Sequence, residues 1–246
     1  MNFTIGKKYT HFEAQLTTHI DSFETSGVQF GDAGRNTIKL FDLEGEQINV
    51  KSFKVPNLIN QVVYNFFRKS KAQRSFEYAS KLLSLDIGTP TPIAFYERPT
   101  IFLFKKSYYI SQHVNYDLTY RELTTNLEYP DSEKIIRKFT RFTFDLHEKG
   151  VNFLDHSPGN TLITKTSDSY DFSIVDLNRM KFGYMDFNTR IRNFAKLTIH
   201  KSIIEVMSDE YAKCSGHDFT TIFKLMWEST ESFQMEYSRK LFIKKK

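Results

Sequence analysis

Three polar residues in the second half of the chain have the types and the spacing to support phosphoryl transfer. Asp155 and Asn160 lie five positions apart in the segment FLDHSPGNTLI, and Asp176 ends the apolar segment FSIVD. A carboxylate can accept the proton of an attacking hydroxyl, while an amide oxygen and a second carboxylate are ligands that suit Mg²⁺. Ser, Pro, Gly and Asn are also the usual residues of turns, so each residue taken alone is equally consistent with an ordinary loop.

Two residues in the first half of the chain could complete such a site. Lys51 lies between apolar neighbours in the segment INVKSF, where a lysine can reach the phosphates of a nucleotide. Glu77 follows on a predicted helix, where its carboxylate could pair with Lys51 and fix the ammonium. A solvent-facing strand lysine and a surface glutamate are the alternatives. The occurrence of all five residues in this order favours a phosphoryl-transfer site.

The elements that carry these residues run from strands, through helices and further strands, to a mainly helical second half. Alternation of apolar and polar residues predicts strands over 27–53, with turns at Gly31, Gly34 and Glu44–Gly45. Other strands are predicted over 92–97, 106–114, 161–165 and 171–177. Apolar residues three and four apart predict helices over 57–69, 71–85 and 131–150, and again from about residue 188 to the end.

This order predicts an α+β protein with a bilobal, protein-kinase-like fold. We expect residues 1–113 to form a small β-rich N-lobe that binds nucleotide. Residues 114–246 would form a larger helical C-lobe with the catalytic loop, the metal site and the acceptor site. No internal repeat or low-complexity linker separates the two parts.

The composition is that of a soluble globular protein, with 246 residues of which 40% are hydrophobic and 26% charged. A single cysteine, Cys214, excludes an intramolecular disulfide framework and a cysteine zinc cluster. The first residues lack the apolar core of a signal peptide and no apolar run approaches membrane-spanning length, so we expect a cytoplasmic protein. A net charge of +5 favours an anionic partner such as phosphate or phospholipid. No nucleic-acid readout motif is recognisable, so no nucleic-acid partner is expected.

The segments LHEKGVNFLDHSPGNTLI and FSIVDLNRMKF resemble the lipopolysaccharide kinase family, the 3-deoxy-manno-octulosonic acid (Kdo) and heptose kinases of Gram-negative bacteria. The resemblance extends to the first half of the chain, in the segments VKSFKVPNLINQVVYNFFRKSKAQRSFEYA and IGTPTPIAFYE. It covers roughly residues 25–200, and the chain looks like a Bacteroidetes-type member of the family. The resemblance implies phosphorylation of a sugar hydroxyl by ATP and Mg²⁺. The acceptor would be a lipid A–Kdo glycolipid at the cytoplasmic face of the inner membrane.

The resemblance also implies roles for individual residues. Lys51 would contact the ATP phosphates with Glu77 as its partner, Asp155 would be the catalytic base, and Asn160 and Asp176 would bind the metal.

Further residues match the nucleotide-binding part of the family. Gly31, Gly34 and Arg35 lie in the segment that would cover the phosphates, although a plain hairpin is about as consistent with this sequence. The backbone from Gln112 to Val114 would meet adenine. His147 would support the catalytic loop.

The chain departs from protein kinases in two places. Phe153 and Leu154 precede the catalytic Asp155 in place of His-Arg, and Leu177-Asn178 follow Asp176 in place of Phe-Gly. With no long activation segment, a small-molecule acceptor is favoured over a protein substrate.

Two other functions stay open at this point. One is a kinase for another small alcohol, although the acidic patch that a cationic substrate needs is not evident. The other is a pseudokinase that binds nucleotide without transferring phosphate. The basic tail SRKLFIKKK is either solvated surface or a peripheral contact with an anionic membrane.

Overall fold

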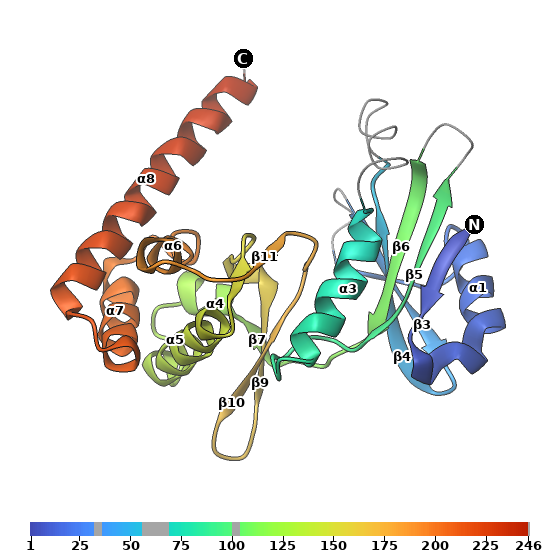
Figure 1. Ribbon diagram of the computed structural model, residues 1–246, viewed down its shortest axis with the longest axis horizontal. Helices are drawn as coiled ribbons and strands as arrows, with labels where there is room; N and C mark the ends of the chain where they lie inside the picture. Colours follow the sequence, from blue (N-terminus) through green and yellow to red (C-terminus); the bar gives the residue numbers. More distant parts are fainter. Residues whose placement is uncertain (32–35, 56–68, 100–103, 246) are drawn as a thin grey trace. The chain divides into compact units, whose positions relative to one another are not determined.

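The computed structural model describes residues 1–31, 36–55, 69–99 and 104–245 (Figure 1). The chain divides into two compact units, residues 1–115 and 116–246. The first unit is built on an antiparallel sheet and the second is mainly helical. The predicted α+β class, with a strand-rich first part and a helical second part, is confirmed. The helix predicted over 57–69 lies, except for residue 69, outside the described residues.

Six antiparallel strands form the sheet of the first unit, in the order β1-β5-β6-β4-β3-β2. Their bounds are β1 Asn2–Ile5, β2 Val28–Phe30, β3 Asn36–Leu43, β4 Glu46–Phe53, β5 Pro92–Pro99 and β6 Phe104–Gln112. The β3–β4 hairpin turns at Glu44 and Gly45, with φ angles of 51° and 87°. Positive φ at both positions is what a tight two-residue hairpin requires, so this predicted turn is confirmed.

One face of the sheet is covered by the 3₁₀ helix η1 (Lys7–Phe12) and the helix α1 (Glu13–Asp21), neither of which the sequence pattern predicted. Their apolar residues pack on every second residue of the strands. The buried cluster comprises Leu16, Ile20, Phe23, Phe41, Leu43, Ile48, Val50, Ile93, Ala94, Tyr96, Tyr108 and Ile110.

The opposite face carries helix α3 (Lys71–Leu83), which begins after Ser70. The Ser70 side chain accepts a hydrogen bond from the backbone N–H of Gln73, as an N-cap does. Ala72 of α3 packs with Phe53 of β4 in a small buried cluster. Because alternate strand residues lie on opposite faces, Lys51 lies on this α3 side of the sheet together with Phe53.

The second unit contains five α-helices and two small sheets among its described residues. The helices are α4 Tyr120–Thr125, α5 Ser132–Glu148, α6 Phe187–Arg192, α7 Lys201–Ser215 and α8 Phe219–Lys245. One sheet has the order β10-β9-β7, from β7 Leu118–Thr119, β9 Thr161–Lys165 and β10 Tyr170–Ile174. The other pairs β8 Val151–Phe153 with β11 Met180–Phe182.

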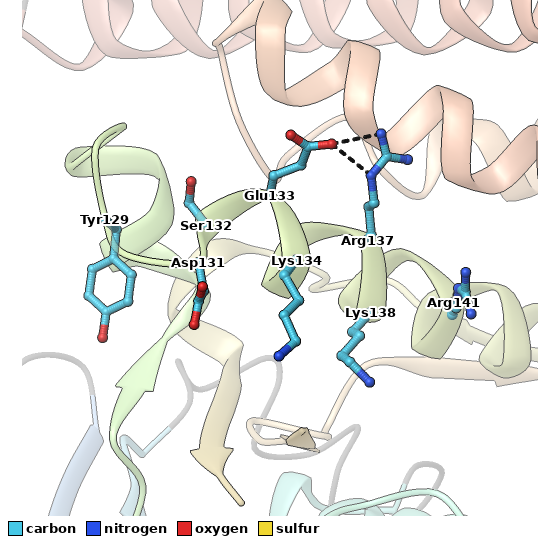
Figure 2. Close-up of a pocket in the computed structure, with 8 residues that line it drawn as sticks. All are labelled: Tyr129, Asp131, Ser132, Glu133, Lys134, Arg137, Lys138 and Arg141. Atoms are coloured by element: carbon cyan, nitrogen blue, oxygen red, sulfur yellow. Dashed lines mark hydrogen bonds and ion pairs between the residues drawn. The ribbon is translucent and has the colours of Figure 1, made fainter. Parts of the chain in front are cut away.

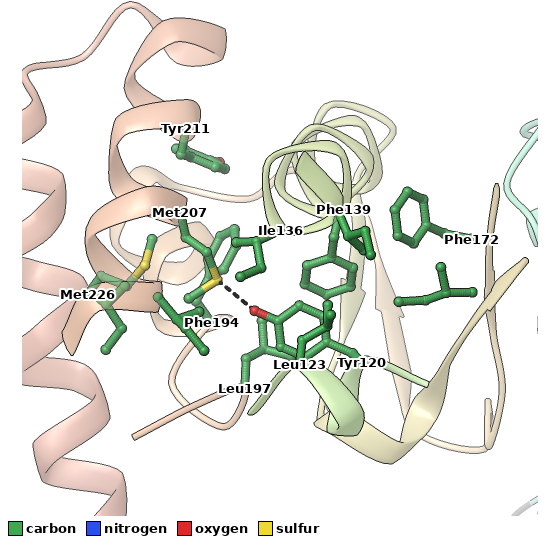
Figure 3. Packing of buried hydrophobic residues seen from close by; sticks show 14 of the residues in the cluster. Tyr120, Leu123, Ile136, Phe139, Phe172, Phe194, Leu197, Met207, Tyr211 and Met226 are labelled. Carbon is green, nitrogen blue, oxygen red and sulfur yellow. Dashed lines mark hydrogen bonds between the residues drawn. The ribbon is translucent and has the colours of Figure 1, made fainter. Parts of the chain in front are cut away.

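A large apolar core joins α4, α5, α7 and α8 to the small sheet (Figure 3). The rings of Tyr120 and Phe139 lie 4.2 Å apart, centroid to centroid. The Tyr120 hydroxyl donates a hydrogen bond of 3.4 Å to the sulfur of Met207, so this polar atom has a partner within the core. Five apolar residues of α5 pack in or against this core, and the end of α5 leads into the segment that carries Asp155. No helix of the described chain is long and apolar enough to cross a bilayer.

Candidate active site

A close approach of two glycines fixes the start of the candidate catalytic segment. Gly150 follows α5 with a φ angle of 67°, and its carbonyl accepts a hydrogen bond of 2.9 Å from the N–H of Gly183. A Cβ atom at position 150 would lie 2.7 Å from the carbonyl oxygen of Gly183, so a larger residue cannot be accommodated without a shift. The chain then enters β8, whose partner strand β11 holds it in place.

Hydrogen bonds connect Asp155, Asn160 and the segment before Asp176. The side-chain nitrogen of Asn160 donates to the carbonyl of Asp155 at 2.8 Å. The carbonyl of Asn160 accepts from the N–H of Val175 at 3.0 Å, next to Asp176 in the chain. Asp155 and Asn160 therefore lie in one turn, and the chain immediately before Asp176 is hydrogen-bonded to that turn. The amide oxygen Oδ1 of Asn160 makes no hydrogen bond to the described residues, which leaves it available as a ligand.

Asp176 adopts the left-handed backbone conformation, with a φ angle of 59°. Its Oδ1 accepts a hydrogen bond of 2.9 Å from the side chain of Asn178. A carboxylate such as that of Asp176 and an amide oxygen such as that of Asn160 are both ligands that suit Mg²⁺, which completes its six ligands with water and phosphate oxygens. In the described part of the chain, no group of three or more His, Cys, Asp or Glu side chains is placed to hold a metal ion.

Two basic side chains that the sequence reasoning missed flank Asp155. Arg179 donates from Nη1 to Oδ1 of Asp155 at 2.9 Å. Lys196 lies 4.0 Å from the same oxygen and donates to the carbonyl of Leu154 at 2.5 Å. Burial lowers the pKa of Lys196, and the carboxylate of Asp155 acts in the opposite direction. The pairing of β8 with β11 brings Arg179 to this position, since the N–H of Leu154 donates to the Arg179 carbonyl.

A largely buried hydrogen-bond network centred on Asn193 holds the segment that carries Asp155. The Asn193 oxygen lies 3.0 Å from Nδ1 of His156 and 3.3 Å from Nε2 of His147. Its nitrogen donates to Asn152 at 3.1 Å and to the carbonyl of Phe153 at 2.9 Å. His147 lies at the end of α5, so its predicted supporting role agrees with this position. The same role for His156 and Asn193 was not predicted.

Burial is the main cause of the shifted pKa values of His147, His156 and Tyr211 in this network. Desolvation lowers the pKa of His147 to about 3 and that of His156 to about 4. The hydrogen bond between each ring and Asn193 raises the pKa, but its effect is smaller. Both rings are therefore neutral at pH 7. Desolvation also raises the pKa of Tyr211, whose hydroxyl lies 3.0 Å from Nδ1 of His147, to about 12.

In the first unit, Lys51 and Glu77 are not paired with each other. The Glu77 carboxylate pairs with Lys69 at 2.7 Å and accepts a hydrogen bond of 3.0 Å from Gln73. The expected Lys51–Glu77 pair is thus not formed among the described residues, because Lys69 stands just before α3 and reaches the same carboxylate. The Lys51 ammonium lies 5.3 Å from the centre of the Phe53 ring.

The other predicted nucleotide-binding residues are only partly described. Gly31 has a φ angle of 68°, whereas Gly34 and Arg35 lie outside the described residues. The N–H of Gln112 donates to Thr91, and that of His113 to Gln47, both at 2.9 Å. Val114 makes no hydrogen bond to the described residues, so its backbone groups are available to a ligand.

A separate pocket of about 660 Å³ runs along α5 in the second unit (Figure 2). Its charged residues already have partners: Arg137 pairs with Glu133 at 2.8 Å, and Lys138 donates to Ser169 at 2.9 Å. None of the predicted site residues lines it.

Comparison with known proteins is informative at the level of structure only. No protein-family model matches the chain, and no curated protein matches its sequence. The solved structure of WaaP in complex with acyl carrier protein is similar, with a TM-score of 0.66 over 98% of this chain and 100% of that one. This chain has a kinase-like fold. At 14% identity the likeness shows the fold alone, and it assigns no role to Lys51, Asp155, Asn160 or Asp176.

Proposed function

We propose that this protein is a kinase that transfers the γ-phosphoryl group of ATP to a sugar hydroxyl of the lipopolysaccharide inner core, a Kdo or heptose on lipid A. The observation that carries the proposal is the connection of Asp155, Asn160 and the Asp176 segment by hydrogen bonds of 2.8 and 3.0 Å within a kinase-like fold. The lipopolysaccharide acceptor and the Bacteroidetes-type assignment rest on the sequence resemblance.

Asp155 acts as the base in this proposal. Its Oδ1 is held by Arg179 at 2.9 Å, whereas Oδ2 accepts no hydrogen bond from the described residues. The acceptor hydroxyl therefore donates to Oδ2 and is oriented towards the phosphoryl group. Positioning of this kind is the main contribution that a kinase makes to the reaction, because the phosphoryl transition state needs little covalent assistance.

Asn160 and Asp176 are the proposed Mg²⁺ ligands. The Asn160 side chain is anchored through its nitrogen, so its oxygen is directed by the backbone of the catalytic segment itself. Bound Mg²⁺ would neutralise charge on the ATP phosphates. In the first unit, Lys51 is the proposed contact to nucleotide phosphates. Gly31, Gly34, Arg35 and the backbone from Gln112 to Val114 are the other proposed nucleotide-binding residues of that unit.

The charge beside Asp155 favours an anionic acceptor over a cationic one. Arg179 and Lys196 place two positive charges around one carboxylate. A cationic alcohol would be repelled there, whereas the carboxylate of Kdo or a phosphate of lipid A would be attracted. This charge supports an anionic glycolipid as the acceptor, in preference to an aminoglycoside or a choline-like alcohol. Because the acceptor is lipid-borne, the proposed location is the cytoplasmic face of the inner membrane, with peripheral contact to anionic lipid.

The proposal is tested by incubating the purified protein with Mg²⁺ and ATP labelled at the γ-phosphate. The acceptors are Kdo-bearing lipid A, the same lipid extended with heptose, lipid A without either sugar, and an aminoglycoside. We expect label to be transferred to the Kdo-bearing or the heptose-bearing lipid. Transfer to the aminoglycoside alone would identify a different small-molecule kinase. Nucleotide binding without transfer to any acceptor would identify a pseudokinase and refute the proposal.

A further inference from the structure

The C-terminal part of α8 is a helix with exposed apolar side chains. Every residue from Met235 to Ile243 is exposed. Figure 1 shows this part of the helix extending beyond α6 and α7. Among these residues, Met235, Tyr237 and Leu241 have exposed fractions of 57%, 51% and 43%. Exposed apolar residues that gather on one face of an element are a common feature of interaction surfaces.

Two of these residues, Tyr237 and Leu241, continue a line of apolar side chains that begins at the half-buried Phe233. Phe233, Tyr237 and Leu241 are here called the α8 stripe. They are spaced four residues apart, which places them in successive turns on the same side. The rings of Phe233 and Tyr237 are stacked, with their centroids 6.2 Å apart. At 1.5 Å per residue the stripe is about 12 Å long.

The α8 stripe begins next to the candidate catalytic segment. The Lys196 ammonium lies 6.0 Å from the centre of the Phe233 ring. The same ammonium lies 4.0 Å from the carboxylate of Asp155. A single side chain thus bridges the proposed base and the inner end of the stripe, and both contacts lie within the second unit.

The exposed end of α8 is also basic. Arg239 and Lys240 lie between Tyr237 and Leu241. Lys240 makes an ion pair of 3.4 Å with Glu236, which leaves the local charge positive. Helices that present apolar side chains together with lysine and arginine bind anionic amphiphiles, with the apolar groups in contact with acyl chains and the cations near phosphates.

We propose that the α8 stripe binds the acyl chains of the anionic glycolipid acceptor. Lys196 contacts both the stripe and Asp155, so a lipid bound on the stripe has its sugar near Asp155, where it is phosphorylated. This inference rests on the proposed kinase function and adds the surface that recognises the lipid part of the substrate. The stripe gives the enzyme a means to prefer a lipid-bearing acceptor over the free sugar.

The test compares Tyr237→Ser/Leu241→Ser with Met235→Ser, a control that removes an equally exposed apolar residue from the other side of the same helix. Each protein is assayed with Kdo-bearing lipid A in detergent and with its delipidated sugar. Binding to lipid A micelles is measured in parallel, and the thermal midpoint confirms that the two variants and the wild-type protein are folded.

We expect the double variant to raise the KM for the lipid acceptor by about 10-fold or more, since two apolar contacts are lost. Activity on the delipidated sugar and the behaviour of Met235→Ser should be unchanged. Equal losses on both acceptors, no loss on either, or a stripe-dependent dimer in light scattering would overturn the inference. If no protein transfers phosphate, the proposed function fails, and the micelle-binding comparison still decides whether the stripe binds lipid.

Discussion

Arg179 holds the carboxylate of Asp155 with a hydrogen bond of 2.9 Å from Nη1 to Oδ1. Asp155 is thereby fixed through one oxygen, while its other oxygen accepts no hydrogen bond from the described residues. A base that is oriented by one partner and open on its other side is suited to a hydroxyl acceptor. This relationship defines the most direct test of the site.

Asp155→Asn should remove turnover and leave nucleotide binding intact, because the amide keeps the shape of the side chain but cannot accept the proton in the same way. The expected loss in kcat is on the order of 10²–10⁴-fold. Asp171→Asn, an exposed aspartate on β10, is the matched control. Near-normal phosphorylation by Asp155→Asn would remove this residue from the mechanism.

Asp176→Asn should weaken the binding of Mg-ATP, since the anionic ligand to the metal is lost. Asn is the suitable replacement because it tolerates the left-handed conformation at position 176, whereas Ala would add backbone strain. Nucleotide titrations with and without Mg²⁺ measure the effect. An unchanged magnesium dependence would mean that Asp176 is only a turn residue.

Glu77→Gln should affect turnover much less than Lys51→Met. The Glu77 carboxylate is paired with Lys69, and ion pairs of such exposure contribute about 0.2–1 kcal/mol at most. Lys51→Met should lower turnover on the order of 10²–10³-fold, as the loss of a phosphate contact does. Glu77→Gln could instead lower turnover as much as Lys51→Met, with the double variant no slower than either single variant. Glu77 and Lys51 would then act as a pair during turnover.

The buried histidines should make the protein less stable at acidic pH. His147 and His156 have pKa values of about 3 and 4 in the folded state, whereas an unfolded histidine takes up a proton near pH 6.5. The unfolded state therefore binds more protons between about pH 6.5 and 4, and the free energy of unfolding falls as the pH is lowered through this range. The slope is up to about 1.4 kcal/mol per pH unit for each histidine.

Urea unfolding at pH 7.5, 6.0 and 5.0 measures this slope. His156→Leu should reduce it by about half, because one of the two buried groups no longer titrates. His11→Gln, which removes an exposed histidine, should leave it unchanged. A slope that His156→Leu does not alter would show that other groups govern the acid sensitivity.

Removal of residues 239–246 should weaken binding to anionic vesicles, most strongly at low salt. The deletion removes Arg239, Lys240 and three lysines, each worth about 1 kcal/mol near an anionic surface, and salt screens such attraction. Co-sedimentation at two salt concentrations provides the measurement, and Arg239→Gln/Lys240→Gln separates the charge from the apolar contacts. Equal binding by the full and truncated proteins would identify the tail as solvated surface.

Local sequence patterns were sufficient for the elements that depend on local physics. The Glu44–Gly45 hairpin was predictable because few residue pairs tolerate two positive φ angles, and α5 because its apolar residues follow the helical period. The sequence also indicated that Asp155 and Asn160 lie in one short loop, although the hydrogen bond from the Asn160 side chain to the Asp155 carbonyl was not predicted.

Only the tertiary structure decided which distant residues meet around that turn. Arg179 reaches Asp155 because β8 pairs with β11, and strands of three residues are too short for their pairing to be read from an alternating pattern. Asn193 joins His147 and His156 across 46 and 37 positions, and Lys69 rather than Lys51 holds Glu77. Such contacts depend on how helices and loops far apart in the chain pack together, and residue type and spacing alone do not specify that packing.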